Sequence, residues 1–326
     1  MGLAIKFVLL VFCVAVTVLI VFASLFFLRP LATTVWLRRR ALRRAGLRKT
    51  KLATAVGRQI IWHGGSGPLL VLLHGAGDQA GTWCKVAPEL KRHFQLVIPD
   101  LAGHGESDPV AGLLSLGTVL SALEEVVDAV PWRNAPMVLA GNSLGAWMAM
   151  LLTEKCAQKS PQRVSRVILI DGGPIRHVSE IGIMPKDRDE ARRALDAVLD
   201  PSTARPPNFV LDDLVRVSNT GPISRLLAAG EKDMSKYLLE DKLAHFQLPV
   251  DLIWGASDRL VPLDYAKKLQ SQLPNCTLTV IEHCGHAPQL ERSSELTQVL
   301  LRILASGSSH GFAGAQSSSA QSGENG

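Results

Sequence analysis

The N-terminal quarter of this 326-residue chain lacks acidic residues altogether. Residues 1–77 hold 11 of the 35 lysines and arginines, and the first acid is Asp78. The remaining 249 residues carry 24 basic and 29 acidic side chains, a net charge of −5, although the whole chain has a formal charge of +6. Nucleic acid attracts proteins with a basic folded surface. The body of this chain is not basic, so we expect no nucleic-acid partner.

Cysteine is also scarce, and its spacing excludes two kinds of protein. The five cysteines form no CxxC pair and no zinc-ligand spacing, and their number is odd. A disulfide-rich secreted scaffold and a structural metal site are therefore not indicated. The pattern favours reduced thiols in a body that faces the cytosol. The five are Cys13, Cys84, Cys156, Cys276 and Cys284.

A long apolar run is present close to the N-terminus. No residue from Phe7 to Leu28 is charged, and a helix of this length would extend about 33 Å, enough for the roughly 30 Å core of a bilayer. A secretory signal peptide is the alternative, but its basic residues should precede a shorter apolar run and a cleavage site should follow. Here only Lys6 precedes the run. We predict an uncleaved, single-pass membrane anchor at 7–28, with the body on the cytoplasmic side.

Residues 29–54 are strongly basic and are predicted to form a juxtamembrane linker. Leu31, Val35, Leu37, Leu42 and Leu47 lie among the arginines, so part of this stretch could be an amphipathic helix on anionic lipid headgroups. The other interpretation is a topology signal without specific lipid contact. The sequence leaves both open.

Residues 55–305 alternate between short apolar runs and segments whose apolar residues recur at helical spacing. Continuous apolar strands are typical of a parallel sheet that is covered on both faces, so the fold class is α/β. The predicted strands are a pair within 55–63, then 69–73, 96–98, 138–140, 167–170, 250–254 and 278–281, and the helices are 82–92, 116–129, 144–157, 263–273 and 291–305.

Two segments depart from this alternation. Residues 175–247 are richer in charge and proline and contain helical patterns at 187–199 and 231–245, which predicts a helical insertion after a strand and not a second independent domain. Residues 306–326 consist mostly of serine, glycine, glutamine and alanine, so they are predicted to be a disordered tail.

The strongest chemical signal is the motif Gly141-Asn142-Ser143-Leu144-Gly145, which lies between a predicted strand and a predicted helix. G-x-S-x-G in this setting is typical of a nucleophilic serine on a sharp turn. The glycines allow the two backbones to approach closely. The helix N-terminus that follows Ser143 favours a developing negative charge. Ser143 is therefore the candidate nucleophile.

A nucleophilic serine needs a base, and the base needs an acid to orient it. Asp258 and His286 each follow a late predicted strand, in the order expected after the serine. The two would emerge at the same edge of the sheet as Ser143. His283 is an alternative base, and Asp171, which follows the strand at 167–170, is an alternative acid.

The loop His74-Gly75-Ala76-Gly77 follows the strand at 69–73 and could supply a backbone N–H to a substrate carbonyl. The amides of Ala76 and Leu144 are the predicted oxyanion-hole donors. His74 is interpreted as a structural residue of this loop. Asp100 and His104 lie near each other in the next polar loop, but they lack further ligands at suitable spacing, so no metal site is predicted.

Four separated motifs occur in a fixed order: HGAG at 74–77, PDLAGHGES at 99–107, GNSLG at 141–145, and WGASDRLVP at 254–262 with CGHAP at 284–288. Over about 55–305 the chain resembles the α/β-hydrolase superfamily. The resemblance implies the nucleophile, acid and base roles of Ser143, Asp258 and His286, and a cap at 175–247. Haloalkane dehalogenases and epoxide hydrolases of this superfamily use aspartate where this chain has serine.

The chain also resembles membrane-bound monoacylglycerol lipases and small carboxylesterases that cleave pimeloyl-type methyl esters. We therefore expect a membrane-anchored serine hydrolase that cleaves hydrophobic or lipid-derived esters, with no cofactor or metal and with a lipid bilayer as its partner. Thioester, amide, lactone and carbon–carbon bond hydrolysis stay open, because one triad supports them all. A non-catalytic membrane scaffold is the alternative from another class.

Overall fold

The computed structural model describes residues 2–129, 131–132, 135–177, 179 and 181–306. Its centre is an eight-stranded sheet in the order β1-β2-β4-β3-β5-β6-β7-β8. β1 and β2 pair antiparallel, β2 pairs antiparallel with β4, and every later pair is parallel. The predicted α/β class with a mostly parallel sheet is confirmed. The strands are β1 Arg48–Thr54, β2 Gly57–Gly64, β3 Leu69–Leu73, β4 Gln95–Pro99, β5 Met137–Asn142, β6 Val164–Ile170, β7 Val250–Gly255 and β8 Cys276–Ile281.

Helices cover both faces of the sheet, which explains why β3 and β7 are buried along their whole length. One hydrophobic cluster lies under α4 (Leu116–Val127), α5 (Leu144–Lys159) and α10 (Leu263–Gln272). A second lies under η1 (Ala80–Lys85), α3 (Ala87–Leu90) and α12 (Ser293–Ser306), and the short helix α11 (Pro288–Glu291) precedes α12. The single helix expected at 82–92 is divided into η1 and α3, because Pro88 has no N–H to continue a helix from the preceding turn.

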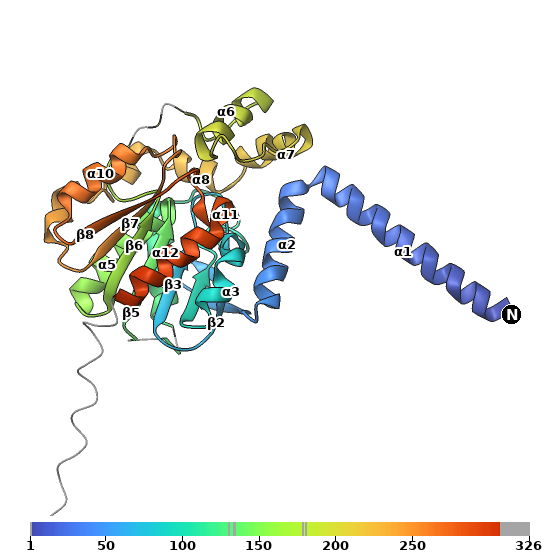
Figure 1. Cartoon of the computed structure of the whole chain (residues 1–326), viewed down its shortest axis with the longest axis horizontal. Helices are drawn as coiled ribbons and strands as arrows, with labels where there is room; N and C mark the ends of the chain where they lie inside the picture. The colour runs from blue at the N-terminus through green and yellow to red at the C-terminus, as the bar shows by residue number, and fades with distance from the viewer. Residues whose placement is uncertain (1, 130, 133–134, 178, 180, 307–326) are drawn as a thin grey trace, which may run out of the picture.

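The cap lies between β6 and β7. It consists of α6 (Arg188–Val198), α7 (Asn208–Ser218), α8 (Pro222–Ala228), α9 (Glu231–Ser235) and the 3₁₀ helix η2 (Glu240–His245). Prolines fall between these helices or start them, which keeps each helix short. Figure 1 shows α6 and α7 beyond the end of the sheet, outside its two helical layers.

The N-terminal region differs from the expected linker at 29–54. α1 (Gly2–Leu28) buries none of its side chains, and by length and composition it could cross a membrane. α2 (Pro30–Arg44) and β1 instead belong to the folded body: Leu42 is fully buried, and all of β1 pairs with β2. The sequence analysis did not predict β1, because this edge strand carries exposed lysines and arginines and lacks a continuous apolar run. The predicted tail lies outside the described residues, apart from Ser306 at the end of α12.

Candidate active site

Ser143 lies on a tight turn between β5 and α5. Its backbone has φ 55° and ψ −117°, an unusual conformation for a residue other than glycine, and its N–H donates to Ile170 O at 2.9 Å. A Cβ on Gly141 would stand 2.2 Å from the Gly145 carbonyl carbon, and one on Gly145 would stand 2.4 Å from Leu73 O. Both motif glycines are therefore required by close backbone contact. The strained turn holds the serine away from the sheet and into a cavity.

Asp258 and His286 meet at the carboxyl end of the neighbouring strands. Asp258 follows β7 and His286 follows β8, and His286 Nδ1 lies 2.7 Å from Asp258 Oδ2. The other carboxylate oxygen of Asp258 accepts the N–H groups of Leu260 and Val261, each at 2.9 Å. The aspartate is thus locked in position, and its contact with Nδ1 leaves His286 Nε2 as the nitrogen that can exchange a proton.

The backbone of His286 is fixed by residues that the sequence analysis did not single out. Asn142 Nδ2 donates to His286 O at 2.9 Å, and Gln289 Nε2 donates to Asn142 Oδ1 at 3.1 Å. From the cap, Val198 O accepts the His286 N–H at 2.7 Å. Asn142 is the residue directly before Ser143, so one short segment carries the serine and also holds the histidine loop. Its place inside the G-x-S-x-G motif is the signal that could have identified it.

Asp171, the alternative acid, and His283, the alternative base, lie outside the contact between Asp258 and His286. Asp171 is fully buried with φ 48°, and its Oδ1 accepts the Gly255 N–H at 2.8 Å. Burial, together with the nearby charge of Asp258, raises the pKa of the Asp171 carboxyl well above its usual range. Asp171 therefore stands beside the acid of the pair as a neutral group. His283 is exposed on the turn after β8.

The two predicted backbone donors line the same cavity as Ser143. Within the described part of the chain, the N–H groups of Ala76 and Leu144 have no hydrogen-bond partner. Leu144 is the first residue of α5, where an N–H has no acceptor inside the helix. This arrangement leaves two N–H donors near the serine for a bound oxygen atom.

The histidines of the neighbouring loops have structural roles. His74 Nε2 accepts the Leu101 N–H at 2.9 Å, and its Nδ1 donates to Gly75 O at 2.8 Å. Burial and the adjacent His74 lower the pKa of His104 to about 3, so His104 is neutral. Among the residues that the structure describes, no group of three or more His, Cys, Asp or Glu side chains is arranged to hold a metal ion.

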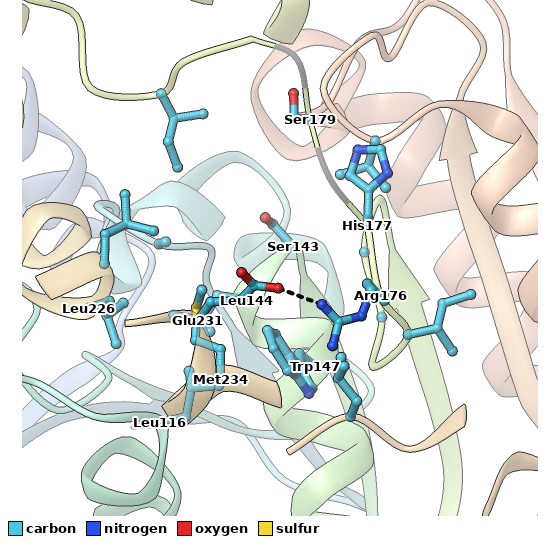
Figure 2. Close-up of a pocket in the computed structure, with 18 of the residues that line it drawn as sticks. Leu116, Ser143, Leu144, Trp147, Arg176, His177, Ser179, Leu226, Glu231 and Met234 are labelled. Carbon is cyan, nitrogen blue, oxygen red and sulfur yellow. Dashed lines mark hydrogen bonds and ion pairs between the residues drawn. The ribbon is translucent and has the colours of Figure 1, made fainter. Parts of the chain in front are cut away.

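The cavity has a volume of about 480 Å³ and walls that are mostly apolar. Figure 2 shows Ser143 between α9, which carries Glu231 and Met234, and the segment after β6, which carries Arg176 and His177. Arg176 Nη1 lies 2.5 Å from Glu231 Oε1, so the cation in this wall is already paired. The apolar lining includes Leu116, Leu144, Trp147, Ile175, Ile223 and Leu226.

Comparison with known proteins identifies the family of this chain. The sequence profile of the alpha/beta hydrolase family matches residues 70–299. The chain belongs to this family. Within the alpha/beta hydrolases, it is 27% identical over 264 residues to a 2-hydroxy-6-oxo-6-phenylhexa-2,4-dienoate hydrolase of Burkholderia cepacia, covering 74% of this chain and 90% of that protein. It is 23% identical over 262 residues to human monoacylglycerol lipase ABHD6, covering 74% and 77%.

Solved structures of other alpha/beta hydrolases share the fold over more of the chain. A bacterial membrane phospholipase A superposes with a TM-score of 0.72 at 24% identity, covering 94% of this chain and 99% of that one. A structure described as a putative lipase from Acinetobacter baumannii superposes with a TM-score of 0.70 at 22% identity, covering 86% and 97%. At these identities the likeness establishes the fold alone.

Proposed function

We propose that this alpha/beta hydrolase is a membrane-anchored serine esterase with the triad Ser143, His286 and Asp258. The observation that carries the proposal is the 2.7 Å contact between His286 and Asp258 at the strand ends beside Ser143. A neutral imidazole held in this tautomer can accept the proton of a serine hydroxyl. The apolar cavity next to Ser143 suits a hydrophobic acyl group.

The reaction follows from these positions. Ser143 Oγ attacks the ester carbonyl carbon, and its proton passes to His286 Nε2. The resulting oxyanion accepts the N–H groups of Ala76 and Leu144. The imidazolium, stabilised by Asp258, returns the proton to the departing alcohol and leaves an acyl-serine. Water then attacks the acyl group, again with His286 as base, which releases the carboxylic acid and restores Ser143.

Carbon–carbon bond hydrolysis is the second candidate, because several relatives are named as hydrolases of oxo-dienoates. Such a substrate carries a carboxylate, and a buried carboxylate needs a free cation or several donors. In this cavity Arg176 is paired with Glu231. That pair is exposed and weak, so the mostly apolar walls are what favours an uncharged ester over a dienoate.

We further propose that α1 anchors the enzyme and that the body faces the cytoplasm. The support is an apolar helix with no buried side chain, which carries one lysine, Lys6, near its start and is followed by arginines. A cleaved signal peptide would instead leave a shortened mature protein. Intact mass of the membrane-bound protein tests cleavage. Protection of a C-terminal tag from external protease in sealed cells tests orientation, and digestion without permeabilisation would contradict it.

Labelling with a fluorophosphonate probe tests the catalytic proposal. The wild type should be labelled, and Ser143→Ala should abolish both labelling and ester hydrolysis. Ser179→Ala is the matched control, because Ser179 lines the same cavity and should leave labelling intact. Hydrolysis of an uncharged ester should also greatly exceed cleavage of an oxo-dienoate. Absence of labelling in the wild type would support the non-catalytic scaffold, and equal labelling of wild type and Ser143→Ala would mean that the reactive nucleophile is another residue.

A further inference from the structure

The C-terminal end of α1 packs against the cap. The rings of Phe26 and Phe27 lie 5.7 and 5.1 Å, between centroids, from the ring of Phe209 in α7. The Leu31 N–H, in the first turn of α2, donates to Asp213 Oδ2 at 3.0 Å. Asp213 is buried, and its Oδ1 pairs with Arg216 at 2.5 Å. Its carboxyl group lies at the N-terminus of α2, where the helix dipole is positive. Figure 1 shows α7 beside the corner at which α1 meets α2.

This attachment fixes the depth of Phe209 relative to a membrane. Phe26 and Phe27 belong to the apolar segment proposed to span the bilayer, in its last turn before Arg29. A side chain that packs on that turn lies at the same level. Phe209 must then lie at the boundary between acyl chains and headgroups, although it belongs to the cap and follows Phe27 by about 180 residues in the sequence.

α2 has two unlike faces. Its inner face packs on the body: Leu42 is fully buried, and Arg39 forms ion pairs with Asp100 at 3.2 Å and with Glu106 at 2.6 Å. Its outer face exposes Trp36 and Leu37, at 49% and 46%, together with two arginines four residues apart. These are Arg40, whose guanidinium lies 5.5 Å from the centre of the Trp36 ring, and Arg44.

The outer face of α2 carries unbalanced positive charge. Neither Arg40 nor Arg44 forms an ion pair with an acidic side chain in the described ranges, whereas the inward-facing Arg38 and Arg39 do. Exposed tryptophan and leucine beside free arginines are the composition of helices that lie in the interface of anionic membranes.

Trp36 also reaches back along α1. Its ring meets that of Phe22 edge-on, with centroids 6.5 Å apart. Phe22 is six residues before the end of α1 at Leu28, which corresponds to about 9 Å of helix. Interfacial helices bury their apolar side chains about 5–10 Å into this boundary. The contact thus places Trp36 within the depth that such side chains occupy.

We propose that Trp36, Leu37, Arg40 and Arg44 of α2, together with Phe209 of α7, form a membrane-contact face that rests on the headgroup boundary of an anionic bilayer. The inference rests on the proposed membrane anchor. The arginines pair with lipid phosphates, and the aromatic rings enter the acyl boundary. Because Phe209 belongs to the cap and the cap forms part of the cavity wall, this face holds the cavity next to the bilayer from which a lipid ester would come.

The tryptophans make this face measurable in the full-length protein. Trp36 is exposed, Trp147 is half-buried in the cavity, and the other four are buried. In vesicles that contain phosphatidylglycerol and a phosphatidylcholine brominated near the headgroup, the wild type should lose tryptophan fluorescence by contact quenching. Trp36→Phe should remove most of that quenching, and adding Phe209→Trp to this variant should restore it.

The charge requirement has its own control. Replacing phosphatidylglycerol by zwitterionic lipid should reduce the quenching of the wild type. Arg40→Gln with Arg44→Gln should be insensitive to this change in lipid. Arg302→Gln, an exposed arginine on α12, should behave as the wild type does. Equal quenching of the double variant and the wild type in anionic vesicles would contradict the role of the two arginines.

Vesicle flotation and fluorophosphonate labelling separate the possible failures. A protein that does not float with vesicles after an alkaline wash lacks the anchor, and the membrane-contact face then fails with it. A protein that floats and is labelled, but whose quenching is the same in wild type and Trp36→Phe, retains the proposed function and overturns the face. If Phe209→Trp in the Trp36→Phe background shows no quenching, the cap does not contact the membrane and that part of the proposal is wrong.

Discussion

Two carboxyl groups lie side by side at the candidate active site, and the proposed triad predicts opposite consequences for their replacement by asparagine. Asp258 accepts three hydrogen bonds, including the one from His286, and orients the imidazole. Asp171 accepts from Gly255 and is buried as a neutral acid. Asparagine closely mimics a protonated carboxyl group but cannot replace a carboxylate that stabilises an imidazolium.

The expected magnitudes differ by orders of magnitude. Loss of tautomer control in a triad lowers kcat about 10⁴-fold, which is roughly 5.4 kcal/mol of transition-state stabilisation, so Asp258→Asn should be severely impaired. Asp171→Asn keeps an acceptor for Gly255 and needs no change of charge. Its kcat should stay within about threefold of the wild type, or about 0.7 kcal/mol.

Stability against pH gives a second readout for Asp171. The folded pKa of this carboxyl lies above the unfolded value of about 3.9, so unfolding releases a proton once the pH exceeds that value. The wild type should therefore lose stability as pH rises from about 4 toward the folded pKa, by at most about 1.4 kcal/mol per pH unit from this group. Asp171→Asn does not titrate, so its Tm relative to the wild type should increase over that range.

Steady-state hydrolysis of an ester and thermal unfolding from pH 4 to 8 check both parts. If Asp171→Asn were the inactive variant and Asp258→Asn nearly normal, the acid assignment would be reversed. A Tm difference that does not change with pH would mean that the Asp171 carboxyl is ionised in the folded protein. Either result would refute the reasoning from burial and contact.

Three further predictions concern positioning, specificity and the N-terminal region. Asn142→Ala leaves His286 O and Gln289 without their partner, so unfolding should become easier by about 1–3 kcal/mol and kcat should fall, as measured by denaturation and ester hydrolysis. Met234→Trp should fill part of the cavity and exclude about two methylene groups of a long substrate. In an ester chain-length series, kcat/KM should then fall about 15-fold for the longer esters and stay unchanged for the shortest. A chain beginning at Arg29 loses only the ring contacts of α1 with Trp36 and Phe209, so it should unfold slightly more easily than the full chain. A chain beginning at Lys51 also loses buried Leu42 and part of β1, so it should be destabilised by at least about 2–5 kcal/mol. An unchanged chain-length profile for Met234→Trp would contradict the second prediction, and equal Tm values for the chains beginning at Arg29 and at Lys51 would contradict the third.

Most of the sheet could be predicted because its signal is local. A parallel strand covered on both faces must be apolar along its length, and segments such as Leu69–Leu73 show this directly in the sequence. The serine turn is also a local feature, since the glycines around Ser143 are required by backbone contacts within the motif and with the adjacent strand.

Residues with few local signals were harder to interpret. α2 and β1 looked like a basic linker, because the acids that pair with Arg39 and Lys49 lie more than fifty residues later. The position of Asn142 in the G-x-S-x-G motif marks it as part of the site, but nothing local indicates that its side chain reaches His286 O, 144 residues away. These contacts exist only after distant segments have packed together.

The sequence by itself determined the α/β fold, the order of the three candidate catalytic residues and the apolar N-terminal helix, because each depends on the hydrophobic pattern or on a short motif. Only the tertiary structure shows that the His286 imidazole contacts Asp258 and not Asp171. Both follow adjacent parallel strands, and the imidazole contacts the one carboxylate that its own loop reaches. The tertiary structure also shows that the end of α1 packs on Phe209 of the cap and that the start of α2 bonds to Asp213. Such choices depend on where chain folding brings remote side chains, which no local pattern encodes.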